Sequence, residues 1–360
     1  MTGSGAPKTQ VLWASGRDGY HTYRIPALLP AANGDLLAFC EGRRDSAQDW
    51  GQIDLLLKRS ADGGRTWSAQ QVVATEPGMT CGNPCPVLDR DTGVIWLPFC
   101  KNRADGGYPE IVAGRAPRTA WLTHSADHGH TWSAPVEITA QVKKNCWTGY
   151  ATGPGHALQL ASGRLIIPCD HYTGVRLDPS DPYGSHLIYS DDHGATWRLG
   201  AVLSLPGNES CALELDDGAV YLNCRTRKEL SVRSYGLSRD GGLSFLEEGL
   251  HRELVEPRGG RGGCQGSLLK LPAPDGGPSL LLFANPATAG EARVRLAIQV
   301  SADEGRTWRE ARVLRSGPSA YADLALAQHG QIACLHEAGE QIYHERIDIS
   351  RFGVEWLLGR

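Results

Sequence analysis

The sequence predicts an all-β protein, a six-bladed β-propeller whose blades are four-stranded antiparallel sheets. The first observation is a short turn motif that recurs five times, with copies that begin at residues 60, 125, 190, 238 and 301. The second is that the apolar runs between these copies are short and bounded by Gly, Asp and Asn. A unit of about 60 residues for each four-stranded sheet fits six blades around an axis. A β-sandwich pair with inserted hairpins is the alternative fold.

The repeated motif reads S-x-D-x-G-x-x-W, as in "SADGGRTW" from Ser60 to Trp67. Its Asp can accept hydrogen bonds from the N–H groups of the turn, its Gly supplies a positive φ, and its aromatic ring packs beneath the loop. Because five equivalent copies cannot all face one pocket, the motif predicts architecture and not chemistry. The fourth copy ends in Phe245 instead of Trp, which predicts a slightly weaker turn and no loss of function.

The segments between the motifs are strand-like. Runs such as "DLLAFCEG", "IDLLLKRS", "GRLIIPCD", "AVYLNCRT" and "RLAIQVSAD" alternate, or are rich in Leu, Ile and Val, and each motif follows one such run. We therefore expect each motif to form the hairpin turn within a four-stranded sheet. A single catalytic domain is expected over residues 11–360, preceded by residues 1–10 as a disordered segment or a scar left by expression.

Composition excludes several classes of partner. The net charge is -4 and no run of Lys or Arg stands out, so neither nucleic acid nor an anionic membrane surface is expected. There is no long apolar stretch, and "MTGSGAPKTQ" lacks the features of a signal peptide. The sequence as written predicts a cytoplasmic protein, or a secreted or periplasmic one if a signal has been removed.

The ten cysteines mostly lie in or near apolar runs, which favours buried, reduced thiols. Cys81 and Cys85 are four residues apart, but no second Cys or His pair with zinc spacing follows. We expect no metal site, and nothing in the spacing calls for calcium.

Three arginines each lie at the end of a predicted strand: Arg24 in "YHTYRIPALL", Arg225 in "VYLNCRTR" and Arg293 in "EARVRLAIQVS". An arginine among apolar residues is costly to bury without an anionic partner. Taken singly, each is typical of a surface charge. Taken together, they indicate a shared role.

The sequence resembles the exo-sialidases, the neuraminidases of bacterial and animal type, from about Trp13 to Glu337. The runs "YRIPALL", "NPCP", "GCQGSL" and "GPSAYADL" and the five turn motifs (Asp boxes) occur in the order seen in that family. The resemblance implies a six-bladed propeller with a terminal sialic acid in a central pocket. It also implies a retaining exo-α-sialidase that acts through a covalent tyrosyl-sialosyl intermediate.

The resemblance implies that Arg24, Arg225 and Arg293 bind the carboxylate of the sugar. Three guanidinium forks around one carboxylate give charge-assisted hydrogen bonds with a geometry that lysine cannot match. Arg227 and Arg295 are near neighbours that remain as alternatives.

The same resemblance assigns the nucleophile to Tyr321 and its base to Glu209. An anionic nucleophile would approach an anomeric carbon that already bears a carboxylate, and sialidases are known to use tyrosine instead. A phenol with an ordinary pKa near 10 is a weak nucleophile and needs a neighbouring base. Without the surrounding residues, Tyr321 would be taken for a core tyrosine.

An acid must protonate the leaving oxygen, and "CEGRRDSAQDWGQIDLLL" offers three aspartates. The family pattern indicates Asp49 as the acid, while Asp45 and Asp54 are alternatives, Asp54 being better placed to start a strand.

Further binding residues follow from the resemblance. Arg43 would reach the sugar, with Arg44 as its solvent-facing neighbour, and Glu337 would orient the first arginine. Asn83 and Gln265 would contact the N-acyl and glycerol parts of the sugar, each being otherwise a turn residue. Tyr172 and Trp147 are candidates for the pocket wall.

Several alternatives remain open at this level. They are a trans-sialidase, a sialidase that prefers the deaminated sugar (KDN), a catalytically silent sialic-acid-binding propeller, and an interaction propeller without a site. No cofactor is expected, and the expected partners are sialylated glycans, glycoproteins or gangliosides. Asp170 and His171 occupy a place where the family often has aromatic residues, which leaves the linkage preference open, as it does the oligomeric state.

Overall fold

The chain folds almost entirely into β-strands. The computed structural model describes residues 5–173, 183–227, 229–273 and 276–359. Within them the helical elements are short: α1 (Tyr108–Val112), α2 (Thr139–Val142), α3 (Val354–Leu358) and the 3₁₀ turn η1 (Gln328–Gly330). None of these helices is long and apolar enough to cross a membrane. The expectation of an all-β protein is confirmed.

The strands in the first third of the described chain are β1 (Lys8–Ala14), β2 (Thr22–Pro30), β3 (Leu36–Arg43), β4 (Ile53–Ser60), β5 (Gln71–Ala74), β6 (Met79–Gly82), β7 (Val87–Leu88), β8 (Ile95–Arg103) and β9 (Thr119–Ser125). The middle third holds β10 (Val136–Glu137), β11 (Gly149–Thr152), β12 (Leu158–Gln159), β13 (Leu165–Tyr172), β14 (Tyr183–Ser190), β15 (Arg198–Val202), β16 (Ser210–Glu214), β17 (Val220–Cys224) and β18 (Val232–Ser238). The last third holds β19 (Glu247–Val255), β20 (Ser267–Leu271), β21 (Leu280–Pro286), β22 (Val294–Ser301), β23 (Arg309–Leu326), β24 (Ile332–Ala338) and β25 (Arg346–Phe352).

Hydrogen bonding joins the described strands into four sheets. Their orders are β1-β25-β24-β23-β22-β21-β20, then β10-β9-β8-β6-β4-β3-β2 with β5 on β4 and β7 on β8, then β11-β13-β14-β15 with β12 on β13, and β16-β17-β18-β19. Almost all pairs are antiparallel and connect strands that are neighbours in the chain. This local pairing is what short strands separated by tight turns favour.

The two larger sheets are each held together at one point. β23 pairs with β22 through its first part, from Arg309 to Pro318, and with β24 through its second part, from Ser319 to Leu326. β4 meets β6 through a single parallel pair, Ile53 with Thr80. On either side of these points the strands form antiparallel groups.

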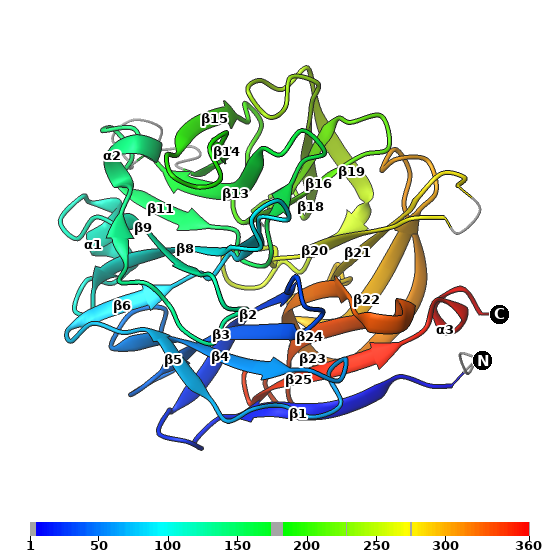
Figure 1. The fold of residues 1–360 in the computed structure, drawn as a ribbon, viewed down its shortest axis with the longest axis horizontal. Coiled ribbons are helices and arrows are strands. Elements are labelled where there is room, and N and C mark those ends of the chain that lie inside the picture. Colours follow the sequence, from blue (N-terminus) through cyan, green and yellow to red (C-terminus); the bar gives the residue numbers. More distant parts are fainter. Residues whose placement is uncertain (1–4, 174–182, 228, 274–275, 360) are drawn as a thin grey trace.

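The groups follow one another around the centre of the molecule in chain order (Figure 1). The N-terminal strands lie at the bottom of that view and the later ones follow at the left, top and right. β1 then pairs with β25, so the first and last described strands are neighbours. Residues 8–10 belong to β1, which corrects the expectation that residues 1–10 lie outside the domain. Residues 1–4 lie outside the described residues.

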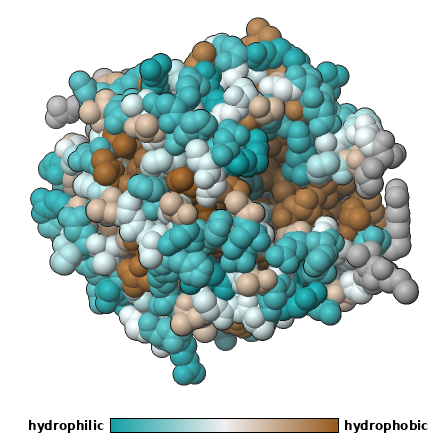
Figure 2. All heavy atoms as spheres, in the orientation of Figure 1, coloured by the Kyte–Doolittle hydropathy of each residue, from teal (hydrophilic) through white to brown (hydrophobic). Residues whose placement is uncertain are grey.

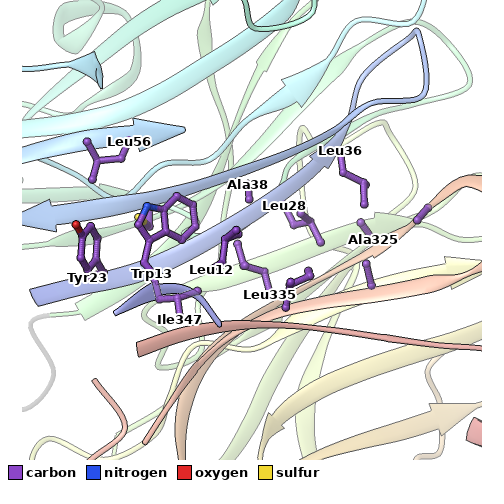
Figure 3. Packing of buried hydrophobic residues seen from close by; sticks show 14 of the residues in the cluster. Leu12, Trp13, Tyr23, Leu28, Leu36, Ala38, Leu56, Ala325, Leu335 and Ile347 are labelled. Carbon is purple, nitrogen blue, oxygen red and sulfur yellow. The ribbon is translucent and has the colours of Figure 1, made fainter. Parts of the chain in front are cut away.

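Apolar side chains fill the space between neighbouring groups of strands. One cluster joins β1, β2, β3, β4, β23, β24 and β25, and Figure 3 shows Trp13, Tyr23 and Leu28 among its members. Trp13 and Tyr23 are 1% and 0% exposed, and burial on this scale is the main favourable term in folding. Polar side chains cover most of the face seen in Figure 2. All ten cysteines are free and nine are buried, as the sequence predicts.

Each Asp box forms the turn before the outermost strand of its group, as expected. In the first copy Ser60 Oγ donates to Asp62 Oδ1 at 2.8 Å and accepts from Gly64 N–H at 2.8 Å, while Asp62 Oδ1 accepts from Thr66 N–H at 2.9 Å. Gly64 has φ +83°, which an L-residue adopts only with strain. The turns follow β4, β9, β14, β18 and β22, and none of the box residues lines the large cavity described below.

The aromatic residue of the box does not make the same hydrogen bond in every copy. The indole N–H of Trp67 donates to Gly64 O at 3.2 Å, and Trp197 and Trp308 repeat this bond in their own copies. The indole nitrogen of Trp132 has no partner among the described residues. Phe245 has no donor, yet its box keeps the bonds from Ser244 to Asp240.

Candidate active site

A cavity of about 720 Å³ opens where the groups of strands meet. Of the residues singled out from the sequence, those that line it are Arg24, Arg43, Asp49, Asn83, Tyr172, Glu209, Arg225, Arg227, Arg293 and Tyr321. They come from segments that are far apart in the chain, and the fold brings them to one place. Concave sites with a few convergent polar groups are where ligands bind.

The three arginines of the sequence analysis converge on Tyr321. Arg24 lies near the start of β2, Arg225 directly follows β17, and Arg293 directly precedes β22. The guanidinium carbons of Arg24 and Arg293 lie 5.0 and 5.5 Å from the centre of the Tyr321 ring. Arg225 Nη1 lies 3.2 Å from the Tyr321 hydroxyl. The cavity therefore holds three positive charges around one phenol.

The backbone beside Arg24 is strained. Ile25 has φ +59°, which is rare for a β-branched residue, and the register of β2 against β3 shifts between Arg24 and Ala27. The Ile25 N–H donates to Glu337 Oε1 at 3.0 Å. Strain of this kind persists where the surroundings fix the backbone, and it occurs at functional sites.

Glu337 holds Arg24 from behind. Arg24 Nε donates to Glu337 Oε1 at 3.0 Å and Arg24 Nη2 to Oε2 at 3.1 Å, a bidentate geometry that fixes the plane of the guanidinium. Glu337 is 0% exposed and does not line the cavity. It lies on β24, and besides the Ile25 N–H it accepts from the backbone N–H of Tyr321 at 3.3 Å. One buried carboxylate therefore connects the arginine to the backbone of the tyrosine.

Glu209 and Arg225 are brought together by the start of β16 and the end of β17. The Arg225 N–H donates to Glu209 O at 2.8 Å, next to the pair Ser210 with Cys224. In the side chains, Arg225 Nη1 donates to Glu209 Oε2 at 2.7 Å. Because β16 and β17 are antiparallel, Glu209 before the first strand and Arg225 after the second lie at the same end of the sheet.

The Tyr321 hydroxyl donates a hydrogen bond to Glu209 Oε1. Burial, and then the charge of Glu209, raise the pKa of Tyr321 well above its usual value, against the opposing effect of Arg225, Arg293 and Arg24. The phenol is therefore neutral in the empty cavity. Its proton is already directed at a carboxylate that can accept it.

Asp49 lies between two arginines on the segment that joins β3 to β4. Its Oδ1 is 2.8 Å from Arg43 Nη1 and 3.3 Å from Arg24 Nη1. Its side chain is 67% exposed, because it faces the open cavity. Burial by the surrounding walls acts to raise the pKa of Asp49, but Arg43 and Arg24 outweigh this and hold the pKa well below its ordinary value. In the empty cavity Asp49 is ionised.

Arg43 is fixed as firmly as Arg24. It is 2% exposed, and its Nε and Nη2 donate to Glu41 Oε2 at 3.0 and 2.7 Å, while Nη1 donates to Ala47 O at 2.7 Å. Glu41 Oε1 also accepts from the Asn83 N–H at 2.9 Å. Arg43 and Asn83 thus share one buried carboxylate.

Two expected pocket residues lie elsewhere. Gln265 is 1% exposed and does not line the cavity, because its amide donates to Pro154 O at 3.1 Å and accepts from Ala322 N–H at 3.0 Å. It therefore lies behind the wall that carries Tyr321. Trp147 stacks on His171, with ring centres 3.7 Å apart, and is also absent from the lining. Tyr172 does line the cavity.

The alternative aspartates and arginines can be distinguished by the hydrogen-bond and ion-pair partners of their side chains. Asp54 is 0% exposed and accepts from Tyr20 at 2.7 Å and from Arg44 at 2.6 Å, outside the cavity lining. Arg295 pairs with Glu310 at 2.6 Å, so it is not placed at the cavity. Asp45 is exposed and does not line the cavity either. Of the alternative arginines, Arg227 is the one among the described residues that shares the cavity.

Arg118 is a cavity residue that no sequence motif indicated. It directly precedes β9, lines the cavity, and donates from Nε to Asn102 Oδ1 at 3.1 Å. The available signal was the one that marked Arg293, an arginine just before an apolar strand. Tyr343 was missed as well; its ring centre lies 5.2 Å from Arg24 and 5.6 Å from Arg293. No sequence motif singled it out.

Asp170 and His171 are both buried, on β13. Asp170 Oδ2 accepts from Asn208 at 3.3 Å, and its Oδ1 has no partner among the described residues. Burial, followed by the charge of Glu209, raises the pKa of Asp170 well above its usual value. Asp170 does not line the cavity, so it is a buried acid behind the wall.

One group of side chains has the composition of a metal site. Asp89, Asp91 and His193 lie close together, away from the cavity lining. Asp89 is already bonded to Thr92 and Gln159 at 2.7 and 2.9 Å. These bonds account for the arrangement of the group without an ion.

Comparison with known proteins identifies a family. The BNR repeat-like domain matches residues 34–334. A sialidase of Micromonospora viridifaciens is 33% identical over 97% of this chain, which spans 54% of that protein, about half its length. Sialidase-3 of Mus musculus is 33% identical over 94% of this chain and 92% of its own length.

Solved structures give the same picture of the fold. The Hadza microbial sialidase Hz136 superimposes with a TM-score of 0.83 at 25% identity, over 96% of this chain and 68% of that one. The Trypanosoma rangeli sialidase in complex with the inhibitor DANA superimposes with a TM-score of 0.80 at 16% identity, over 96% of this chain and 59% of that one. The second comparison shows a shared fold alone.

Proposed function

Because this chain belongs to the sialidase family of glycoside hydrolases, we propose that it is a retaining exo-α-sialidase that removes terminal sialic acids from glycans, glycoproteins or gangliosides. The observation that carries the proposal is the hydrogen bond from Tyr321 to Glu209 beneath three convergent arginines. A binding protein has no use for a phenol aimed at a base. A hydrolase that must attack an anionic sugar does.

The arginines bind the carboxylate of the sugar. Arg24, Arg225 and Arg293 surround Tyr321, so a carboxylate held by all three places the anomeric carbon that bears it next to the phenol. Glu337 fixes the plane of Arg24 before the substrate arrives. A pre-oriented guanidinium loses less entropy on binding than a free one.

In the first step Glu209 accepts the phenol proton as the Tyr321 oxygen bonds to the anomeric carbon. The bond from this carbon to the leaving oxygen breaks, and that oxygen takes a proton from Asp49. In the second step Asp49 takes a proton from water, whose oxygen bonds to the anomeric carbon. The bond to Tyr321 then breaks and the phenol recovers its proton from Glu209. Two displacements at one carbon retain its configuration.

Substrate binding prepares Asp49 for its role as an acid. In the empty cavity Arg43 and Arg24 hold the pKa of Asp49 low, against the effect of burial. A substrate carboxylate on Arg24 compensates that positive charge and adds a negative one nearby. Both changes favour the protonated form of Asp49, so the acid gains its proton in the complex.

The strand pairing supports a six-bladed propeller. The seven-stranded sheet divides at the middle of β23, and the nine-stranded sheet divides at the contact of β4 with β6. With the two smaller sheets this gives six antiparallel groups around the cavity. We propose that each group is one blade and that residues 8–359 form one catalytic domain.

The test replaces Tyr321 by Phe and measures hydrolysis of a fluorogenic α-sialoside. Loss of the nucleophile should lower kcat by at least about a thousandfold. Tyr343→Phe is the matched control, because it removes a phenol hydroxyl from the same cavity next to the same two arginines. It should lose far less activity. The first product formed by the wild type should be the α-anomer by NMR, and equal rates for Tyr321→Phe and wild type would overturn the mechanism.

A further inference from the structure

Arg118 is a cavity arginine without a carboxylate partner among the described residues. Its Nε donates to Asn102 Oδ1 at 3.1 Å, and its Nη1 lies 3.4 Å from Asn83 Oδ1. Within the described chain its Nη2 has no hydrogen-bond partner, and it is not sealed from the cavity. Arg24, Arg43 and Arg225 differ, because each pairs with a carboxylate. Arg118 therefore keeps donors free for a ligand.

Arg118 and Arg293 adjoin strands that lie on opposite sides of the centre of the molecule (Figure 1). Arg118 directly precedes β9, whereas Arg293 directly precedes β22, and Figure 1 shows β9 and β22 on opposite sides of the centre. In the six-membered ring of a sialic acid, the carboxylate is on C2 and the ring atom directly opposite is C5. A sugar whose carboxylate is held near Arg293 and Tyr321 therefore presents its C5 substituent toward the side of Arg118.

Two buried amide side chains flank Arg118. Asn83 and Asn102 are 7% and 2% exposed, and their side-chain oxygens face the guanidinium. A methyl group placed here would displace water from guanidinium N–H donors without replacing the hydrogen bond, which is costly. A hydroxyl oxygen would accept that bond. The amide carbonyl of an acylated sugar is common to acetyl and glycolyl forms, so it does not distinguish them.

Resting on the proposed function, we infer that Arg118 is a specificity residue that selects sialic acids whose C5 substituent ends in a hydroxyl. Two sugars have this chemistry: the N-glycolyl form and the deaminated form, with a hydroxyl directly on C5. The N-acetyl form, which ends in a methyl group, is the disfavoured substrate. A site built to bond a substrate hydroxyl rejects the analogue that lacks it much more strongly than an apolar pocket rejects an extra group.

The experiment compares kcat/KM for three 4-methylumbelliferyl sialosides that differ only at C5: N-acetyl, N-glycolyl and hydroxyl. For the wild type, at least one hydroxyl-terminated substrate should exceed the N-acetyl one by about tenfold, as expected for one hydrogen bond to a charged group. If the N-glycolyl substrate is preferred, Arg118 forms its hydrogen bond farther from the sugar ring than if the hydroxyl substrate is preferred. An N-acetyl rate equal to or above both others overturns the inference.

Three variants separate selection from general damage. Arg118→Met should reduce the preference to about twofold or less, and Arg118→Lys should keep part of it because one donor and the charge remain. Arg227→Met, which removes another cavity arginine, should leave the ratio unchanged. Since each ratio is internal to one protein sample, partial unfolding cannot mimic the result. A preference that survives in Arg118→Met, or that Arg227→Met also removes, overturns the inference.

Failure of the inference is distinguishable from failure of the proposed function. If the wild type hydrolyses none of the three substrates, the proposed function fails. If it hydrolyses all three without the expected preference, the proposed function stands and the role of Arg118 falls.

Discussion

The Asp boxes and the cavity are built on opposite principles. In a box the bonds that form the turn are local: Ser60 bonds to Asp62 and Gly64, and Asp62 bonds to Thr66, so these partners are no more than four residues apart. In the cavity Arg24 and Glu337 are 313 residues apart, and Tyr321 and Glu209 are 112 apart. A box can form from its own sequence, whereas the site exists only when the whole fold does.

This difference predicts how far the effect of a substitution extends through the structure. A box lies at the surface and repeats five times, so the loss of one copy is confined to one turn. A cavity residue is buried against others that depend on it, because Glu337 alone contacts Arg24, Ile25 and the backbone of Tyr321. Changes in the cavity should therefore affect stability and activity together, and changes in a box should affect stability alone.

The largest effect is expected from Glu337→Ala, which removes the buried, bidentate counterion of Arg24. Breaking a buried ion pair from one side costs about 3–5 kcal/mol of unfolding free energy, measured by urea denaturation. Activity should fall as well, because Arg24 is no longer held in place. Asp105→Ala is the control, since Asp105 pairs with Arg103 on the surface with both side chains more than 60% exposed. If both variants were equally stable, the distinction between cavity and surface charges would fail.

Asp49→Asn should remove the acid without disturbing the fold. Loss of a general acid lowers kcat by about 10²–10⁴ for a natural alkyl leaving group, and much less for a nitrophenyl leaving group that departs without a proton. For the wild type, the fall of kcat with rising pH should lie at higher pH than that of kcat/KM. The reason is that the substrate raises the pKa of Asp49 above its value in the free enzyme. Equal losses on the two leaving groups would contradict the assignment of Asp49.

In a box, Asp127→Ala should cost about 1–2 kcal/mol of unfolding free energy and leave kcat unchanged. The side-chain and backbone bonds from Thr131 hold the pKa of Asp127 below its ordinary value, more than offsetting the small effect of burial. The stabilisation is therefore present above the unfolded pKa of about 4 and is lost as the pH falls through the folded pKa. The difference from wild type should shrink between pH 5 and pH 2, which urea denaturation in that range checks. A change in kcat would mean that boxes and cavity are coupled.

The smallest effect is expected from Phe245→Trp in the fourth box. An indole N–H could donate to Gly242 O as Trp67, Trp197 and Trp308 do in their copies. The gain should be about 0.5–1 kcal/mol, seen as a higher midpoint of thermal unfolding with unchanged kcat. A lower midpoint would show that the space beneath this box fits only a phenyl ring.

The same contrast decides what can be predicted from the sequence. The box turns and their hairpins were predicted correctly because the bonds that form each turn lie within eight residues. The all-β class followed from the repeats and the short apolar runs. Arg118 was not predicted as a cavity residue, although it has the same local pattern as Arg293. The reason is that the sequence of a segment does not determine which end of its strand faces the centre of the molecule.

Gln265 shows that a family motif does not determine where the side chain within it points. Its motif "GCQGSL" is one of those on which the resemblance rests, but the side chain turns away from the cavity to bond Pro154 and Ala322. The direction of a side chain depends on backbone partners that come from other groups of strands. Asp170 is a second example, since its burial beneath Asn208 depends on how β13 packs against β16.

The pairing of β1 with β25 has a consequence for biosynthesis. A chain that emerges from the ribosome exposes the free edge of β1 until β25, which covers this edge, has been made. Glu337, the counterion of Arg24, emerges in the same late stretch. A chain that stopped before this stretch would carry Arg24 without the carboxylate that fixes the plane of its guanidinium.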